Sequence, residues 1–139
     1  MIDKDLIIHS LEHAAEVHGD ITPLVCADLL KNHPEAEVYF DVKGTQFKAD
    51  LQAKMVQDSI YSCLEYLDVP EEAEIVMKYT IPQHQDLGIP IKHFFALLES
   101  VANVVCAATE QESENVKASW QSLMQELKKI ISQNTSEAF

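Results

Sequence analysis

The sequence predicts an all-α fold, and two observations support this class. Apolar residues recur at steps of three and four along nearly the whole chain, which is the period of a helix. The 139 residues include only three glycines and five prolines, whereas all-β folds need many turns built from these residues. The length suits one domain, so we expect a single domain over residues 1–139, with six or seven helices and a frayed tail over residues 133–139.

The first third of the chain predicts two helices separated by a glycine. Apolar residues line a helix over about residues 6–17, which stops at Gly19. Asp20 can cap a second helix. That helix should end near His33-Pro34, because the residue before a proline avoids helical backbone angles. We expect a loop over residues 41–49, which hold a glycine and polar side chains.

The rest of the chain predicts longer helices. An apolar stripe indicates a helix over about residues 50–67, and Pro70 with two acidic neighbours begins the next one. Pro82 should break or kink that helix, because proline lacks an N–H group and clashes with the preceding turn. The apolar residues that continue it are Ile75, Val76 and Tyr79. The last two helices are expected over residues 91–105 and 116–131, with a polar break at residues 110–114.

The charge and the cysteines exclude several classes of function. With 23 acidic and 10 basic residues the net charge is -13, which opposes binding to nucleic acid or an anionic membrane. The sequence shows no signal peptide and no stretch of about 18 apolar residues that predicts a membrane span. Three separated cysteines without CxxC spacing argue against a disulfide framework or a cysteine zinc site. We therefore expect a cytoplasmic protein.

Two motifs resemble the globin family. Residues 29–40 run from a leucine-rich helix through a His-Pro-Glu corner to Phe40, and residues 84–94 hold a histidine, a glycine and a second histidine before an aromatic residue. Trp120 also suits the family. The resemblance covers about residues 3–132. It implies a globin fold packed around a haem pocket, with haem b (iron protoporphyrin IX) as the cofactor.

The resemblance also implies roles for particular residues. His84 matches the proximal histidine that ligates haem iron, whose other ring nitrogen is usually held by a backbone carbonyl a few residues earlier. Phe40 would pack against the porphyrin. His93 could neighbour a haem propionate, or be a surface histidine, and Lys92 is a weaker propionate candidate. His33 belongs to the corner motif and is interpreted as structural.

The distal side of the pocket, above the iron, departs from many oxygen-binding globins. The family's usual intervals place Met55 there, and a different gap would place Gln52 there instead. Ser59, one turn further, and Cys26 would also face the ligand. Met55 would act as a flexible apolar filler, or alternatively as a second iron ligand. Such a pocket would hold oxygen less tightly than a distal histidine does.

The proximal side, where His84 would bind the iron, departs from the family at two positions. Bacterial globins commonly have tyrosine where this chain has Phe94, and phenylalanine cannot hydrogen-bond to make the proximal imidazole more basic. Pro82, two residues before His84, should re-aim the histidine. The phenylalanine makes peroxidase-like electron push less favourable, whereas Pro82 could alter iron–histidine strain or signal that haem binding has weakened or been lost.

These residues together predict a haem-binding globin that reversibly binds oxygen or nitric oxide. One alternative is a haem redox enzyme, such as a nitric oxide dioxygenase supplied by a separate reductase. Others are an electron-transfer protein with a His84/Met55 iron and a haem-free interaction module. The sequence favours no enzyme class, and it leaves open whether the protein is a monomer or a homodimer.

Overall fold

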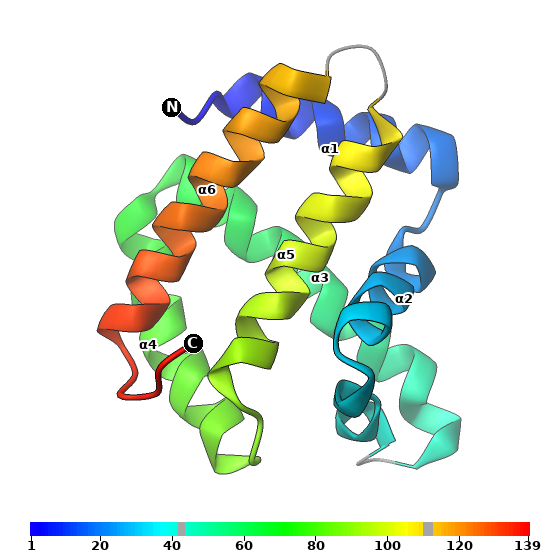
Figure 1. Cartoon of the computed structure of the whole chain (residues 1–139), viewed down its shortest axis with the longest axis vertical. Coiled ribbons are helices and arrows are strands. Elements are labelled where there is room, and N and C mark those ends of the chain that lie inside the picture. Colours follow the sequence, from blue (N-terminus) through cyan, green and yellow to red (C-terminus); the bar gives the residue numbers. More distant parts are fainter. Residues whose placement is uncertain (42–43, 110–112) are drawn as a thin grey trace.

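The computed structural model describes residues 1–41, 44–109 and 113–139 as helices joined by short connections (Figure 1). These ranges contain six α-helices, two 3₁₀ segments and no strand, which confirms the all-α prediction. The elements are α1 (Lys4–His18), α2 (Thr22–Asn32), η1 (Pro34–Asp41), η2 (Thr45–Phe47), α3 (Lys48–Asp68), α4 (Pro70–Asp86), α5 (Ile91–Ala108) and α6 (Ser113–Gln133). Residues 110–112 of the expected polar break lie outside the described residues.

The ends of the first two helices follow from local side chains. The Asp3 carboxylate accepts a backbone N–H at the start of α1, and α1 stops at Gly19, whose φ of 69° favours glycine. The Asp20 carboxylate accepts the N–H of Thr22 at 3.0 Å, but the N-cap residue of α2 is Ile21, which makes no side-chain cap hydrogen bond, so the cap predicted at Asp20 is wrong by one residue. Helix α2 ends at Asn32, directly before the His-Pro pair. The predicted ends at Gly19 and near His33-Pro34 are confirmed.

The predicted break at Pro82 is wrong, because α4 runs through it without interruption. Proline removes the hydrogen bond that would otherwise reach the carbonyl of Lys78, four residues earlier. Pro82 and Lys78 are both exposed and lie near the end of the helix, where water can replace the missing partner. The expected loop over residues 41–49 is also partly helical, since η2 and the start of α3 fall within it. Residues 42–43 of that loop lie outside the described residues.

Helix α4 turns a different face inward from the one its larger apolar residues suggest. Ile75, Val76 and Tyr79 are exposed, and Tyr79 keeps 72% of its surface. The buried residues of α4 are Ala73, Met77 and Ile81. The three exposed residues therefore continue the helix, as expected, without packing in the core.

Helix α5 is the centre of the fold and packs against all five other α-helices (Figure 1). By length and composition it could cross a membrane, but half of it is buried inside this fold, as in the core helix of a globular domain. Helix α6 is tied to α1 by the buried Trp120, whose indole N–H donates to the Ser10 hydroxyl at 2.9 Å. Burial raises the pKa of the Cys63 thiol to about 12, so this cysteine is an inert core residue.

The C-terminal tail makes specific contacts, in contrast with the frayed end expected for it. After α6 the chain turns back toward the corner between α4 and α5 (Figure 1). Thr135 accepts a hydrogen bond from the Gln85 side chain at 2.9 Å, and Glu137 accepts one from the backbone N–H of Ile91 at 2.9 Å. Phe139 lies edge-on to the Phe95 ring, 5.8 Å between centroids. The tail thus holds the corner that follows His84.

Candidate functional site

His84 lies in the last turn of α4 with one ring nitrogen engaged by the backbone. Its Nδ1 is 2.8 Å from the carbonyl oxygen of Thr80, one turn earlier. A carbonyl only accepts hydrogen bonds, so Nδ1 is the donor in this bond and Nε2 is the ring nitrogen that lies outside it. In its neutral form the half-buried imidazole could ligate a metal through Nε2.

The corner after His84 is held by backbone hydrogen bonds. The carbonyl of His84 accepts the N–H groups of Leu87 and Ile89, and Gly88 makes the turn with a φ of 79°. The ring of Phe94 lies edge-on to the imidazole, with 4.9 Å between centroids. Phe94 has no polar atom, so the Thr80 carbonyl is the partner that orients this histidine.

Two of the expected haem-contacting residues lie together in an apolar cluster apart from the main core. Phe40 is buried and Met55 is half-buried, and they belong to one apolar cluster. Its other members include Leu29, Leu30, Ala36, Tyr39, Leu51, Ala96 and Leu97. Leu97 also packs against the main core, together with Phe94. Helix α5 therefore connects the His84 corner to the cluster of Phe40 and Met55.

The other expected distal residues are engaged differently. The Ser59 hydroxyl donates to the carbonyl of Met55 at 2.9 Å, so it satisfies its own helix. Cys26 is buried in the main core, where burial raises the pKa of its thiol. Gln52 is half-buried on α3. Their distal roles stay predictions, and so does the choice between Met55 and Gln52.

A groove of about 910 Å³ lies elsewhere, between α5 and α6. Charged side chains such as Glu99, Lys117 and Lys128 line it. Among the described residues that line this groove there is no histidine. Its walls therefore do not suit a histidine-ligated haem, and we assign no cofactor to it.

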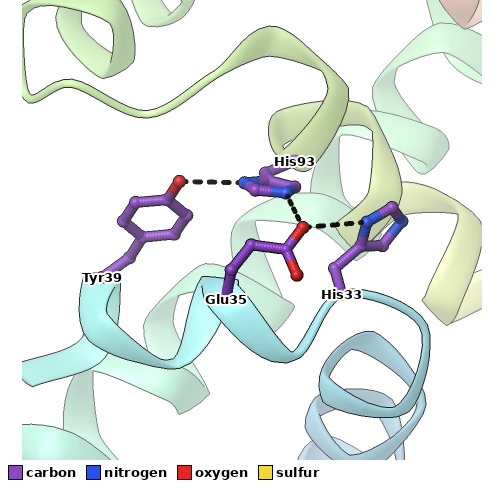
Figure 2. Close-up of polar contacts among 4 residues, drawn as sticks. All are labelled: His33, Glu35, Tyr39 and His93. Atoms are coloured by element: carbon purple, nitrogen blue, oxygen red, sulfur yellow. Dashed lines mark hydrogen bonds and ion pairs between the residues drawn. The ribbon is translucent and has the colours of Figure 1, made fainter.

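His93 has a protein partner at each of its two ring nitrogens (Figure 2). Its side chain is 4% exposed, with Nδ1 2.9 Å from the Tyr39 hydroxyl and Nε2 2.8 Å from the Glu35 carboxylate. His33 is 3.7 Å from the same carboxylate oxygen. Both ring nitrogens of His93 thus already have protein partners, and its propionate role stays a prediction.

The sequence did not point to Glu35 or Tyr39. The His-Pro-Glu corner could have indicated Glu35 as a polar candidate, but its partner lies 58 residues away. The remaining polar side chains considered from the sequence are exposed. Lys92 is exposed on α5, and His9, His13 and His18 are exposed on α1.

Helices in this order, with a buried aromatic after a His-Pro corner and a histidine in the last turn of α4, define an all-α domain. The family model described as Globin matches residues 25–131, most of the chain, so the protein belongs to the globin family. This membership confirms the predicted family and supports a haem-binding globin in general. Comparisons with curated proteins and with solved structures give no match.

Proposed function

We propose that this protein binds haem b through Nε2 of His84 and reversibly binds a diatomic gas, oxygen or nitric oxide. Bound haem would supply a ferrous iron with an open coordination position for the gas. The observation that carries the proposal is the hydrogen bond from His84 Nδ1 to the Thr80 carbonyl. It selects the tautomer and orients the ring as a metal ligand requires.

The same hydrogen bond favours reversible binding over redox turnover. A carbonyl is a neutral acceptor, so it makes the imidazole less electron-rich than a carboxylate partner would. Phe94, which lies against the ring, offers no further hydrogen bond. Nitric oxide dioxygenation would in addition need electrons from a separate reductase. We therefore favour gas binding as the function.

On the gas side, Phe40 and Met55 supply an apolar wall. Phe40 is 5% exposed, and its ring would pack against the face of the cofactor. The Met55 thioether excludes water but has no hydrogen to donate to a bound gas. Because the Ser59 hydroxyl already donates to a backbone carbonyl, we expect oxygen to be held less firmly than in globins with a distal histidine.

Absorption spectra of the tag-free protein titrated with haemin test the proposal. We expect an intense Soret band for the wild type and a five-coordinate ferrous spectrum that changes when carbon monoxide is added. His84→Ala should abolish or strongly weaken the band. The matched control is His9→Ala, since His9 is exposed on α1. This control should behave as the wild type does.

Two other results would contradict the proposal. A wild type without a Soret band would favour a haem-free interaction module. A six-coordinate ferrous spectrum that becomes five-coordinate in Met55→Leu would identify Met55 as a second iron ligand and favour electron transfer. Equal spectra for the wild type and His84→Ala would exclude His84 as the ligand.

A further inference from the structure

Three metal-ligating side chains converge at the junction of η1 and the start of α5, away from His84. His33 ends α2, and Glu35 lies in the first turn of η1. His93 lies in the first turn of α5, where its backbone N–H bonds to the carbonyl of Pro90. Figure 2 shows the three side chains pointing toward one shared point. The fold therefore brings together groups that are far apart in the sequence.

The distances within this cluster suit a small dication. The Glu35 oxygen is 2.8 Å from His93 Nε2 and 3.7 Å from His33 Nδ1, and all three ligand atoms lie within 4.8 Å of one another. Ligands about 2.1 Å from a tetrahedral Zn²⁺ lie about 3.4 Å from one another. The separations of 2.8 and 3.7 Å lie on either side of that value, and none exceeds 4.8 Å.

Tyr39 provides the outer support that a histidine ligand needs. Its hydroxyl lies 2.9 Å from His93 Nδ1, the ring nitrogen that faces away from Glu35. When a cation takes the lone pair of Nε2, Nδ1 carries the proton and the phenolic oxygen can accept it. The His93 ring is thereby held in a fixed orientation before any cation arrives.

Exposure and donor type indicate which cation would bind. The His93 side chain is buried, whereas those of His33 and Glu35 are 31% and 54% exposed, so a cation can enter from the solvent side. Water can occupy the fourth position there. Two imidazoles and one carboxylate suit Zn²⁺ and similar transition-metal dications, whereas Ca²⁺ and Mg²⁺ prefer an all-oxygen set.

We propose that His33 Nδ1, Glu35 and His93 Nε2 form a binding site for a Zn²⁺-class dication, with Tyr39 as the positioning residue for His93. This site does not include His84, the proposed iron ligand, and it goes beyond the proposed function. A bound cation would join η1 to α5 beside Phe40 and would stabilise the folded chain by mass action. Haem binding at His84 is not required for it.

Calorimetric titration of the tag-free, chelator-treated protein with Zn²⁺ tests this proposal. We expect one Zn²⁺ per chain, and we expect Mg²⁺ and Ca²⁺ not to compete. His33→Ala, at a partly exposed position that folding tolerates, should lower the affinity at least about 100-fold, and Tyr39→Phe should lower it about 10- to 100-fold. His9→Ala and His84→Ala should leave it unchanged. In the Co²⁺-loaded protein, visible absorption should show four-coordination.

Several results would overturn the Zn²⁺ site. They are the absence of binding by the wild type, an unchanged affinity in both His33→Ala and Glu35→Gln, and loss of binding in His84→Ala. Unchanged affinity in Tyr39→Phe would overturn the positioning role alone. The two proposals can fail separately, because His84 belongs only to the haem site. A wild type that binds Zn²⁺ but shows no Soret band with haemin would contradict only the haem proposal.

Discussion

His84 and His93 stand on either side of the corner between α4 and α5, and their surroundings differ in one decisive way. His84 has Nδ1 engaged by a backbone carbonyl of its own helix, which leaves Nε2 available. His93 has both ring nitrogens engaged, by Tyr39 and Glu35 of η1. The partners of His84 thus come from its own helix, whereas those of His93 come from another element, so His93 joins η1 to α5 and His84 does not.

The largest expected effect is on haem binding, and it should separate the two histidines. His84→Ala removes the proposed iron ligand, so the Soret band of the haemin-loaded protein should be lost. His93→Gln keeps hydrogen-bonding groups near Tyr39 and Glu35 and should retain the band. Absorption spectra of the two variants measure this difference. Loss of the band in His93→Gln alone would reverse the roles given to these histidines.

The next effect is on the free energy of unfolding of the haem-free protein. Here the substitution of His93 should cost more than the substitution of His84. His93→Ala leaves a part-buried Tyr39 hydroxyl without its partner and opens a small cavity, which should cost about 1–3 kcal/mol of unfolding free energy. His84→Ala removes a bond to a carbonyl at the end of a helix and should cost about 0.5–1 kcal/mol. Urea unfolding followed by circular dichroism measures both values. Equal losses would mean that His93 has no special structural role.

A smaller effect is expected from the tail that holds the corner between the two histidines. Glu137→Ala removes the acceptor for the first N–H group of α5, so the free energy of unfolding should fall by about 1 kcal/mol. The matched control is Ser136→Ala, at an exposed neighbouring position. Urea unfolding of both variants gives the values. A loss no greater than that of the control would show that the tail contact adds nothing to stability.

The smallest effect is on the pH dependence of stability, and it comes from Glu35, the carboxylate partner of His93. A hydrogen bond from its own backbone N–H, followed by the one from His93, lowers the pKa of the Glu35 carboxyl below its ordinary value of 4.5. A lowered folded-state pKa adds stability above that ordinary value, and this stability is lost as the pH falls through the folded-state pKa.

Glu35→Gln should therefore flatten the decline of stability in acid. Urea midpoints recorded from about pH 6 down to about pH 3 would show the change. The effect should be small because the carboxylate is largely exposed. Asp5→Asn, at an exposed carboxyl on α1, is the control. Parallel pH curves for the wild type and Glu35→Gln would contradict the coupling between Glu35 and His93.

Much of the fold could be predicted because helix ends are local. Gly19 and the His33-Pro34 pair end their helices through backbone angles that involve only their neighbours. The helix break predicted at Pro82 was wrong because the cost of a proline depends on whether the carbonyl that loses its hydrogen bond is exposed to water, and here both Pro82 and Lys78 are exposed. The contact made by Glu137 in the tail could not be predicted, since its partner lies 46 residues away.

The sequence by itself determined the all-α class, the family motifs and the choice of His84 as the ligand candidate, because helical period and motif spacing are carried by neighbouring residues. The tertiary structure alone decided which groups face each ring nitrogen of these histidines. Whether a ring nitrogen keeps its lone pair depends on groups that folding brings within about 3 Å. For His93 those groups lie 54 and 58 residues away in the chain, so no local pattern could reveal them.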